Sequence, residues 1–413
     1  MISMRRMPIK LWRGPRFWIQ RDWELAAEIK TVLSILHVAT HEGVYRGGAV
    51  QACRIANAQA RAGHLVTLVV NAPLKTKRAK AAAHLATWRG RLDPLVRLRR
   101  LPLKSLLGRW ALDILIRLGR YDVVHAHRDV ALNCVARIAR HNSRFAFIAQ
   151  RGTTTRAPKR VRRIFRSLRL DAITAVAEAV VQSLLAQGAA ASRIHMIYGI
   201  VDIDEFSPGP RDESLRARHG FAPEDYVIGS LSSYRKEKGL EAIVEAAAEA
   251  RATNPRIKLL FLASDVEHAL KESMDIEGDT IESRCAFAGH QSDIAPWIRA
   301  MDCTIIAATA REGLSGVLRE SLACETPVIS TDSDGNTEIV KDRETGLLVE
   351  AGNTASLRDA MLWAAAHPAE MTQFARAGRH WVADNCSDSR HVDCSVRAYR
   401  AAIARRATKP APR

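Results

Sequence analysis

The chain has 413 residues, of which 47% are hydrophobic, and its net charge of +18 divides into +26 over residues 1–200 and −8 over residues 201–413. This length and composition allow two buried cores and exclude a disordered or fibrous protein. No apolar run reaches the roughly 18 residues that a membrane-spanning helix needs, and the basic N-terminus lacks the features of a signal peptide, so we expect a cytoplasmic protein.

The seven cysteines are odd in number, scattered and without a CxxC pair. We therefore expect buried, reduced thiols, with neither a disulfide framework nor a structural zinc site. The basic first half indicates that this half meets an anionic partner.

The first half predicts alternating strands and helices. A basic, aromatic-rich extension over residues 1–30 precedes a buried strand at 31–40. A loop with two adjacent glycines, a helix at 49–62 and a strand at 65–70 follow, which makes a βαβ unit. Further elements are expected at residues 123–127 (strand), 145–150 (strand), 156–170 (basic helix), 172–188 (strand and helix) and 194–197 (strand).

Turn-forming residues cluster at 194–210, where the sign of the charge also changes, so we place the domain boundary there. The second half restarts the alternation. Its strands are predicted at residues 226–232, 258–263, 303–310 and 327–332, and its helices at 239–252, after the strand at 303–310, and at 355–366, where GLLVEAG at 346–352 precedes the helix.

This pattern predicts an α/β protein with two Rossmann-like, doubly wound domains that face a central cleft. The N-terminal domain spans 31–199 and the C-terminal domain 200–385, while a helix in 386–413 crosses back to the first domain and carries a basic tail. In open parallel sheets, ligands bind beyond the carboxyl ends of the strands, so we expect the site in the cleft.

The most informative segment is EGLSGVLRESLACETPVI, in which Glu312 and Glu320 are eight residues apart. A helix that starts near Gly313 leaves the backbone amides of Gly313, Leu314 and Ser315 free to bind an anion or a hydroxyl oxygen. A carboxylate further along the helix suits a vicinal diol, because its two oxygens accept from two hydroxyl donors.

This segment resembles the retaining glycosyltransferases of the GT-B fold, family 4, whose hallmark is two glutamates in the pattern E-x7-E. The match continues beyond these glutamates through NTEIVKDRETGLLVEAGN at 336–353. In total the resemblance covers residues 31–400. It implies that Glu312 contacts the donor sugar and that Glu320 holds the ribose of the nucleotide.

Other segments match the same family. KEKGLEAIVEA at 236–246 resembles the motif whose lysine, here Lys238, reaches the donor diphosphate, and the linker at 198–208 also fits. The glycine pair Gly47 and Gly48 resembles the loop that approaches the donor phosphate. The family usually has an arginine where this chain has Ser233, and we expect the nearby Arg235 to substitute for it.

Two residues are expected near the acceptor, and one of them departs from the family pattern. Arg151 stands where the family commonly has a histidine; an arginine cannot be a general base, but it can bind an anionic group or stabilise the leaving phosphate. His127, in the strand VVHAH, is the better cleft candidate of two histidines, and a structural histidine is an equal alternative.

Basic residues follow the Arg151 loop, and Arg156, Lys159, Arg160 and Arg163 are expected to face the acceptor or a membrane. A second basic run from Lys75 to Arg109 contains Trp88 and many leucines. Basic residues mixed with tryptophan and leucine suit an anionic membrane surface, so we expect a peripheral inner-face enzyme with a lipid-linked or phosphorylated acceptor, as in lipopolysaccharide synthesis. No nucleic-acid-binding motif accompanies the charge.

We expect no cofactor and no metal ion, with a UDP- or GDP-sugar as the donor. Asp332-Ser-Asp334 and Asp202-Ile-Asp204 match a DxD metal motif but are interpreted as polar loops, and dinucleotide and P-loop motifs are absent. The alternatives to a transferase are a nucleotide-sugar epimerase on the same fold and a degenerate scaffold that binds sugars or partners.

Overall fold

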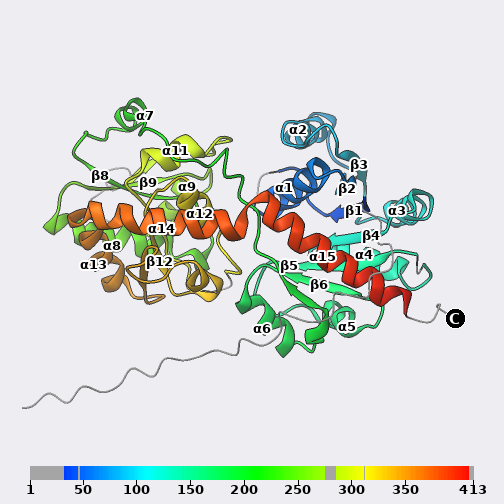
Figure 1. The fold of residues 1–413 in the computed structure, drawn as a ribbon. Helices are drawn as coiled ribbons and strands as arrows, with labels where there is room; N and C mark the ends of the chain where they lie inside the picture. The colour runs from blue at the N-terminus through cyan, green and yellow to red at the C-terminus, as the bar shows by residue number, and fades with distance from the viewer. Residues whose placement is uncertain (1–31, 45–46, 143, 275–284, 311, 409–413) are drawn as a thin grey trace, which may run out of the picture. The chain divides into compact units, whose positions relative to one another are not determined.

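The computed structural model describes residues 32–44, 47–142, 144–274, 285–310 and 312–408. The predicted extension at 1–30 and the end of the predicted basic tail, 409–413, lie outside the described residues. The rest of the chain forms two parallel sheets with helices packed on them (Figure 1). We call the first sheet and its helices the N-terminal lobe and the second sheet and its helices the C-terminal lobe.

The N-terminal lobe has a seven-stranded sheet in the order β3-β2-β1-β4-β5-β6-β7, and all its pairs are parallel. Its strands are β1 (Ser34–Ala39), β2 (Leu65–Asn71), β3 (Arg97–Leu101), β4 (Val123–His127), β5 (Ala146–Arg151), β6 (Ala172–Ala175) and β7 (Ile194–Met196). Its helices are α1 (Gly47–Arg61), α2 (Arg78–Arg89), α3 (Leu106–Gly119), α4 (Arg128–Ile138), α5 (Lys159–Arg166) and α6 (Glu178–Ala186).

The C-terminal lobe has a six-stranded parallel sheet in the order β10-β9-β8-β11-β12-β13. Its strands are β8 (Tyr226–Ser230), β9 (Ile257–Phe261), β10 (Cys285–Phe287), β11 (Cys303–Ile306), β12 (Val328–Thr331) and β13 (Leu347–Val349). Its helices are α7 (Glu213–Arg218), α8 (Leu240–Thr253), α9 (Val266–Ser273), α11 (Ala295–Ala300), α12 (Gly316–Ala323), α13 (Thr354–Ala366) and α14 (Pro368–Cys386).

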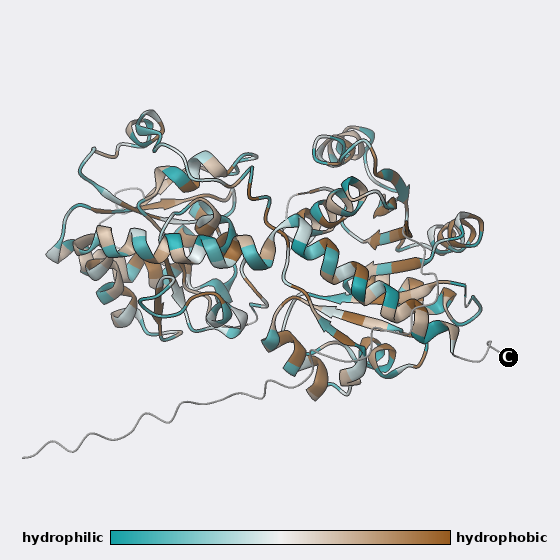
Figure 2. Ribbon diagram, viewed as in Figure 1, coloured by the Kyte–Doolittle hydropathy of each residue, from teal (hydrophilic) through white to brown (hydrophobic). Residues whose placement is uncertain are grey.

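Both faces of the first sheet are buried, because successive side chains along a strand point to opposite faces. Leu36 of β1 packs in the cluster that contains Leu112 of α3 and Phe165 of α5. The preceding residue, Ile35, packs instead with Tyr399. The central strand β1 is accordingly mostly hydrophobic, while the covering helices alternate in hydropathy (Figure 2).

The last helix, α15 (Asp388–Ala407), belongs to the C-terminal end of the chain but packs on the N-terminal lobe (Figure 1). It contacts β5, β6 and α1, and Val396, Tyr399 and Ala402 complete the core on that face. The chain turns into this helix at Ser387, next to the linker, where the Val201 amide donates to the Cys386 carbonyl at 2.9 Å.

The predicted two-domain α/β fold with Rossmann-like sheets is confirmed by these two sheets. The basic stretch at 73–120, in which no strand was predicted, contains β3 as well as α2 and α3. None of the helices within the described residues is both long and apolar enough to span a bilayer. All seven cysteines are free, and six of them are buried.

Candidate donor and acceptor site

Lys238 and Glu312 meet at the carboxyl edge of the second sheet. Lys238 ends a short 3₁₀ turn after β8, Glu312 follows β11, and the Lys238 ammonium pairs with the Glu312 carboxylate. The next residue, Gly239, has a φ of 64° and approaches the Ala307 carbonyl so closely that a side chain has no room. The backbone therefore holds this lysine turn against the strand that leads to Glu312.

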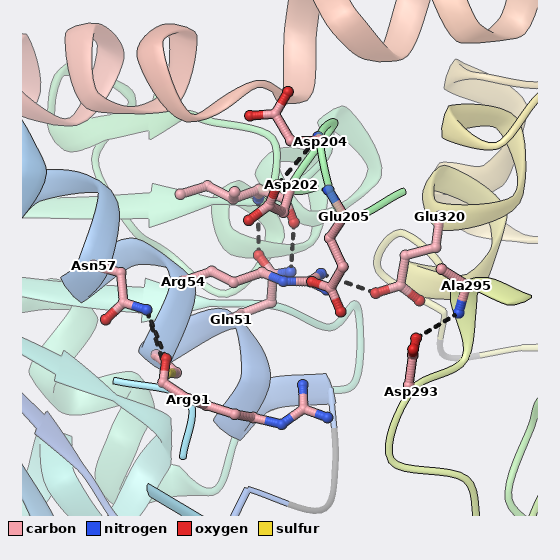
Figure 3. A network of polar contacts seen from close by, with 12 residues as sticks. Gln51, Arg54, Asn57, Arg91, Asp202, Asp204, Glu205, Asp293, Ala295 and Glu320 are labelled. Carbon is pink, nitrogen blue, oxygen red and sulfur yellow. Dashed lines mark hydrogen bonds and ion pairs between the residues drawn. The ribbon is translucent and has the colours of Figure 1, made fainter. Parts of the chain in front are cut away.

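Glu320 lies in the second turn of α12 and is only 9% exposed. Its Oε1 accepts a hydrogen bond of 2.9 Å from Nη1 of Arg54, a residue of α1 in the other lobe (Figure 3). Both carboxylates of the E-x7-E pattern thus pair with a cation, one from each lobe.

The segment after Glu312 contacts the end of β5. A Cβ atom on Gly313 would collide with the Gly152 carbonyl, and one on Gly335 would collide with the Gly313 carbonyl. The Thr154 hydroxyl also donates to Asp334 at 2.9 Å. Gly313, one of the predicted donor residues, therefore lies directly beside the predicted acceptor loop at Arg151.

The helix after Glu312 begins later than the sequence suggested, which corrects one detail of the amide prediction. It starts at Gly316, because the Ser315 side chain caps it by accepting from the Leu318 amide. The Ser315 amide donates to Asn336 Oδ1 at 3.1 Å and is not free. For the amides of Gly313 and Leu314, no hydrogen bond within the described residues is recorded.

The remaining predicted donor residues lie at turns near the two lobes' strand ends. Gly47 and Gly48 form the first turn of α1 rather than a loop, and Gly48 lies against the His41 ring. Arg235 precedes the lysine turn and is exposed, as is Ser233. An exposed guanidinium three residues from Lys238 is free to turn toward a bound anion.

Arg151 ends β5 and is only 7% exposed. It donates to Asp129 Oδ1 at 3.3 Å and to the Thr155 carbonyl. Burial lowers its pKa and Asp129 partly opposes that shift, and the buried Nε has no partner among the described residues. A guanidinium with an unsatisfied buried donor has the capacity to bind an anionic group, although other buried arginine nitrogens here, such as Arg216 Nε, also have no hydrogen-bond partner among the described residues.

His127 is buried inside the sheet, which favours the structural alternative for this residue. Its Nε2 lies 2.9 Å from Nδ1 of His37, and the second nitrogen of His37 contacts Gln59 at 2.8 Å. His125 contacts Tyr399 and Thr174. Burial, followed by the neighbouring histidines, holds the pKa of His127 well below its usual range. These three histidines lie close enough to hold a metal ion, but their hydrogen bonds to protein groups explain them as a neutral core network.

The two DxD sequences lie in loops, where their aspartates accept hydrogen bonds from nearby groups. Asp332 accepts from the Ala351 amide at 2.9 Å, while Asp334 accepts from Thr154. Asp202 accepts from the amides of Asp204 and Glu205.

The basic residues proposed to face an acceptor are exposed around the start of α5; they are Arg156, Lys159, Arg160 and Arg163. Trp88 is fully buried and donates to the Glu42 carbonyl at 3.0 Å, so the expected surface role of this tryptophan is wrong. Among the described residues, Trp110 of α3 is a tryptophan that is exposed, at 64%.

The sequence reading missed Arg54 and Arg128. Arg54 is one of many arginines in the first half, and its partner Glu320 is 266 residues away, so no local pattern marks it. Arg128 follows His127 with a φ of 72° and donates to His41 at 3.3 Å. A left-handed non-glycine residue at a strand end is a signal that only the backbone gives.

Comparison with solved structures assigns the architecture. The structure of HepE from Anabaena in complex with UDP superposes with a TM-score of 0.73 at 18% identity, over 88% of this chain and 99% of that chain. The two-lobed class defined by the sheets and the site is therefore the GT-B fold.

Family models then identify the chain. The model for glycosyl transferases group 1 matches residues 211–381, and that for glycosyltransferase family 4 matches residues 45–205. The chain belongs to the group 1 glycosyltransferases.

Two curated relatives illustrate the range of the family. D-inositol 3-phosphate glycosyltransferase 1 of Catenulispora acidiphila is 27% identical over 73% of this chain and 77% of its own length. Lipopolysaccharide core biosynthesis glycosyltransferase LpsE of Rhizobium meliloti is 31% identical over 38% of this chain. The chain spans only 40% to 49% of the length of LpsE and two other relatives.

Proposed function

We propose that this protein is a retaining glycosyltransferase that moves a sugar from a nucleoside-diphosphate sugar to an anionic acceptor. The observation that carries the proposal is that Lys238 pairs with Glu312, that Glu320 pairs with Arg54 of the other lobe, and that Gly313 lies against Gly152 of the Arg151 loop. The GT-B relative solved with UDP supports a nucleotide donor.

Each donor group has a residue of matching chemistry. The Lys238 ammonium and the Arg235 guanidinium lie within reach of a diphosphate, and the amides of Gly313 and Leu314 add uncharged donors. Glu312 accepts from sugar hydroxyls, and Glu320 accepts from the ribose diol. Because these residues supply the positive charge, the proposal needs no metal ion.

In the transfer, the bond between the anomeric carbon and the diphosphate oxygen breaks as an acceptor hydroxyl oxygen bonds to the same face of that carbon. The hydroxyl proton passes to the departing diphosphate. Lys238 stabilises the negative charge that grows on this leaving group, and such preorganised cations contribute most of their effect in the transition state. No protein side chain acts as the nucleophile.

Arg151 is the residue we assign to the acceptor. Its buried, unpartnered Nε and its position beside Gly313 suit a phosphate or carboxylate on the acceptor. Arg128, at the start of the preceding helix α4 and directly after β4, adds a second guanidinium at the same sheet edge. The acceptor named in the inositol 3-phosphate relative also carries a phosphate.

We further propose that the N-terminal lobe lies against an anionic inner membrane face. Helix α3 exposes large apolar side chains, namely Leu106 (78%), Leu107 (58%), Trp110 (64%) and Leu118 (78%). Lys104 and Arg109 flank its first turn, and the basic start of α5 packs on the same side of the sheet. Apolar side chains flanked by basic ones fit an anionic bilayer surface and a lipid-linked acceptor.

The test of the donor site is binding of UDP, GDP and ADP, with their sugar conjugates, by titration calorimetry. We expect one base to bind and Glu320→Ala to weaken it by about tenfold or more, because a hydrogen bond to a charged group is lost. Glu344→Ala, an exposed glutamate of the same lobe, is the matched control. A wild-type protein that binds none of these compounds would leave the degenerate scaffold as the better account.

A further inference from the structure

A buried arginine joins the two lobes at the proposed ribose site. Arg54 projects from α1 and its side chain is only 11% exposed. One guanidinium nitrogen donates to Glu320 at 2.9 Å and another to Glu205 of the linker at 3.4 Å (Figure 3). The guanidinium also lies over the Phe206 ring, 5.1 Å from its centroid.

The charge balance at this point favours a fixed ion pair. Burial opposes the charged form of Arg54, but Glu320, Glu205 and Asp202 outweigh burial and raise its pKa. An arginine cation enclosed by two carboxylates and an aromatic face stays ionised and loses little freedom when it is bonded. Glu320 is therefore held in one orientation before any ligand arrives.

The helix that carries Arg54 is itself fixed to the linker. Gln51, one turn earlier on the same face of α1, donates to the Ile200 carbonyl at 2.8 Å and accepts from the Ile200 amide at 2.9 Å. Arg54 thus reaches Glu320 from a helix that is bonded to the segment joining the lobes.

We infer that Arg54 is a positioning residue for nucleotide recognition, which orients the Glu320 carboxylate toward the ribose hydroxyls of the donor. This inference rests on the proposed function. A carboxylate has about four lone-pair sites, so the Arg54 bond to Oε1 leaves acceptors for a diol. The N-terminal lobe then contributes to nucleotide affinity without touching the nucleotide.

The ribose preference is the readout that a merely structural role would not change. Calorimetry compares UDP, GDP and ADP with their 2′-deoxy counterparts for wild type, Arg54→Met and Arg54→Lys. For the nucleotide that binds, Arg54→Met should lose about tenfold in affinity and most of its preference for the ribose form, since Glu320 is no longer aligned. Arg54→Lys should recover part of both.

Two further variants complete the test. Arg61→Met removes another arginine of α1. Arg61 pairs with Asp388 at 3.0 Å and not with Glu320, so this variant should keep the wild-type ribose preference. Arg54→Met combined with Glu320→Gln should bind no more weakly than Glu320→Gln alone. An Arg54→Met protein that keeps the wild-type ribose preference overturns this inference alone. Failure of every nucleotide to bind wild type overturns the proposed function, and this inference with it.

Discussion

At the scale of single residues, the proposed donor site is a set of charges that are already paired. Lys238 pairs with Glu312 and Arg54 pairs with Glu320. In the proposed mechanism, a diphosphate attracts the ammonium away from Glu312, which frees that carboxylate for sugar hydroxyls. The Arg54–Glu320 pair stays in place, and both pairs keep buried charges compensated before the donor binds.

Lys238→Met should lower kcat/KM by about 100- to 1000-fold, the usual cost of removing one charge-stabilising donor at a leaving group. Affinity for the nucleoside monophosphate should change little, because it lacks the second phosphate. Steady-state kinetics with the identified donor and titration with mono- and diphosphates measure both effects.

Lys236→Met is the matched control, because Lys236 is exposed in the same turn. If the two variants lose activity equally, the assignment of Lys238 to the leaving diphosphate is wrong.

The residues that the sequence revealed are those whose neighbours in the chain are also their neighbours in the site. Glu312, Glu320 and Lys238 lie in short motifs with fixed spacing, so the resemblance of these motifs to the family singled them out. Arg54 and the unpartnered Nε of Arg151 depend on contacts between distant segments and on burial. Neither leaves a mark in local sequence.

At the scale of secondary structure, the apolar strands were predictable because burial on both faces requires a continuous apolar run. β3 was not predicted because it is an edge strand rich in arginine, with the sequence RLRRL. This composition protects an edge strand from pairing with other chains. The start of α12 was misplaced by three residues because the Ser315 cap outweighed the preceding Gly313.

Helix α3 carries the prediction at this scale. Leu107→Ser combined with Trp110→Ser should reduce binding to vesicles that contain phosphatidylglycerol by about tenfold or more, since each buried large apolar side chain contributes about 1.5–3 kcal/mol. Co-sedimentation at low and high salt separates the apolar from the charged contribution.

Leu65→Ser serves as the control, because Leu65 is 58% exposed at the amino end of β2 and does not belong to α3. Unchanged sedimentation of the α3 variant, with wild-type enzyme bound to the vesicles, would remove α3 from the membrane model.

At the scale of the whole molecule, stability should fall as the pH drops from about 6.5 to 4. Burial lowers the pKa of His37 and of His391 to about 4, from 6.5 in the unfolded chain. Between these values the unfolded state binds more protons, so stability is complete above pH 6.5 and is lost on acidification. Each such histidine contributes on the order of 3 kcal/mol.

Denaturant titrations at pH 7.5, 6 and 5 measure this loss. A His37→Asn variant has one buried imidazole fewer, so its free energy of unfolding should decline less over the same interval. A wild-type stability that stays level from pH 7.5 to 5 would show that these histidines open to solvent.

Because α15 packs on the first sheet, the core of the N-terminal lobe can be completed only after the end of the chain has been synthesised. During synthesis, the strands of the N-terminal lobe leave the ribosome while the helix that covers Ile35 and Ile148 is still unmade. The ~210 residues from the end of β7 to the end of α15 take roughly 10–40 s to translate. Throughout that interval the first sheet shows a bare apolar face, so the nascent chain is a natural client for chaperones, and a premature stop before residue 388 would leave that face uncovered for good.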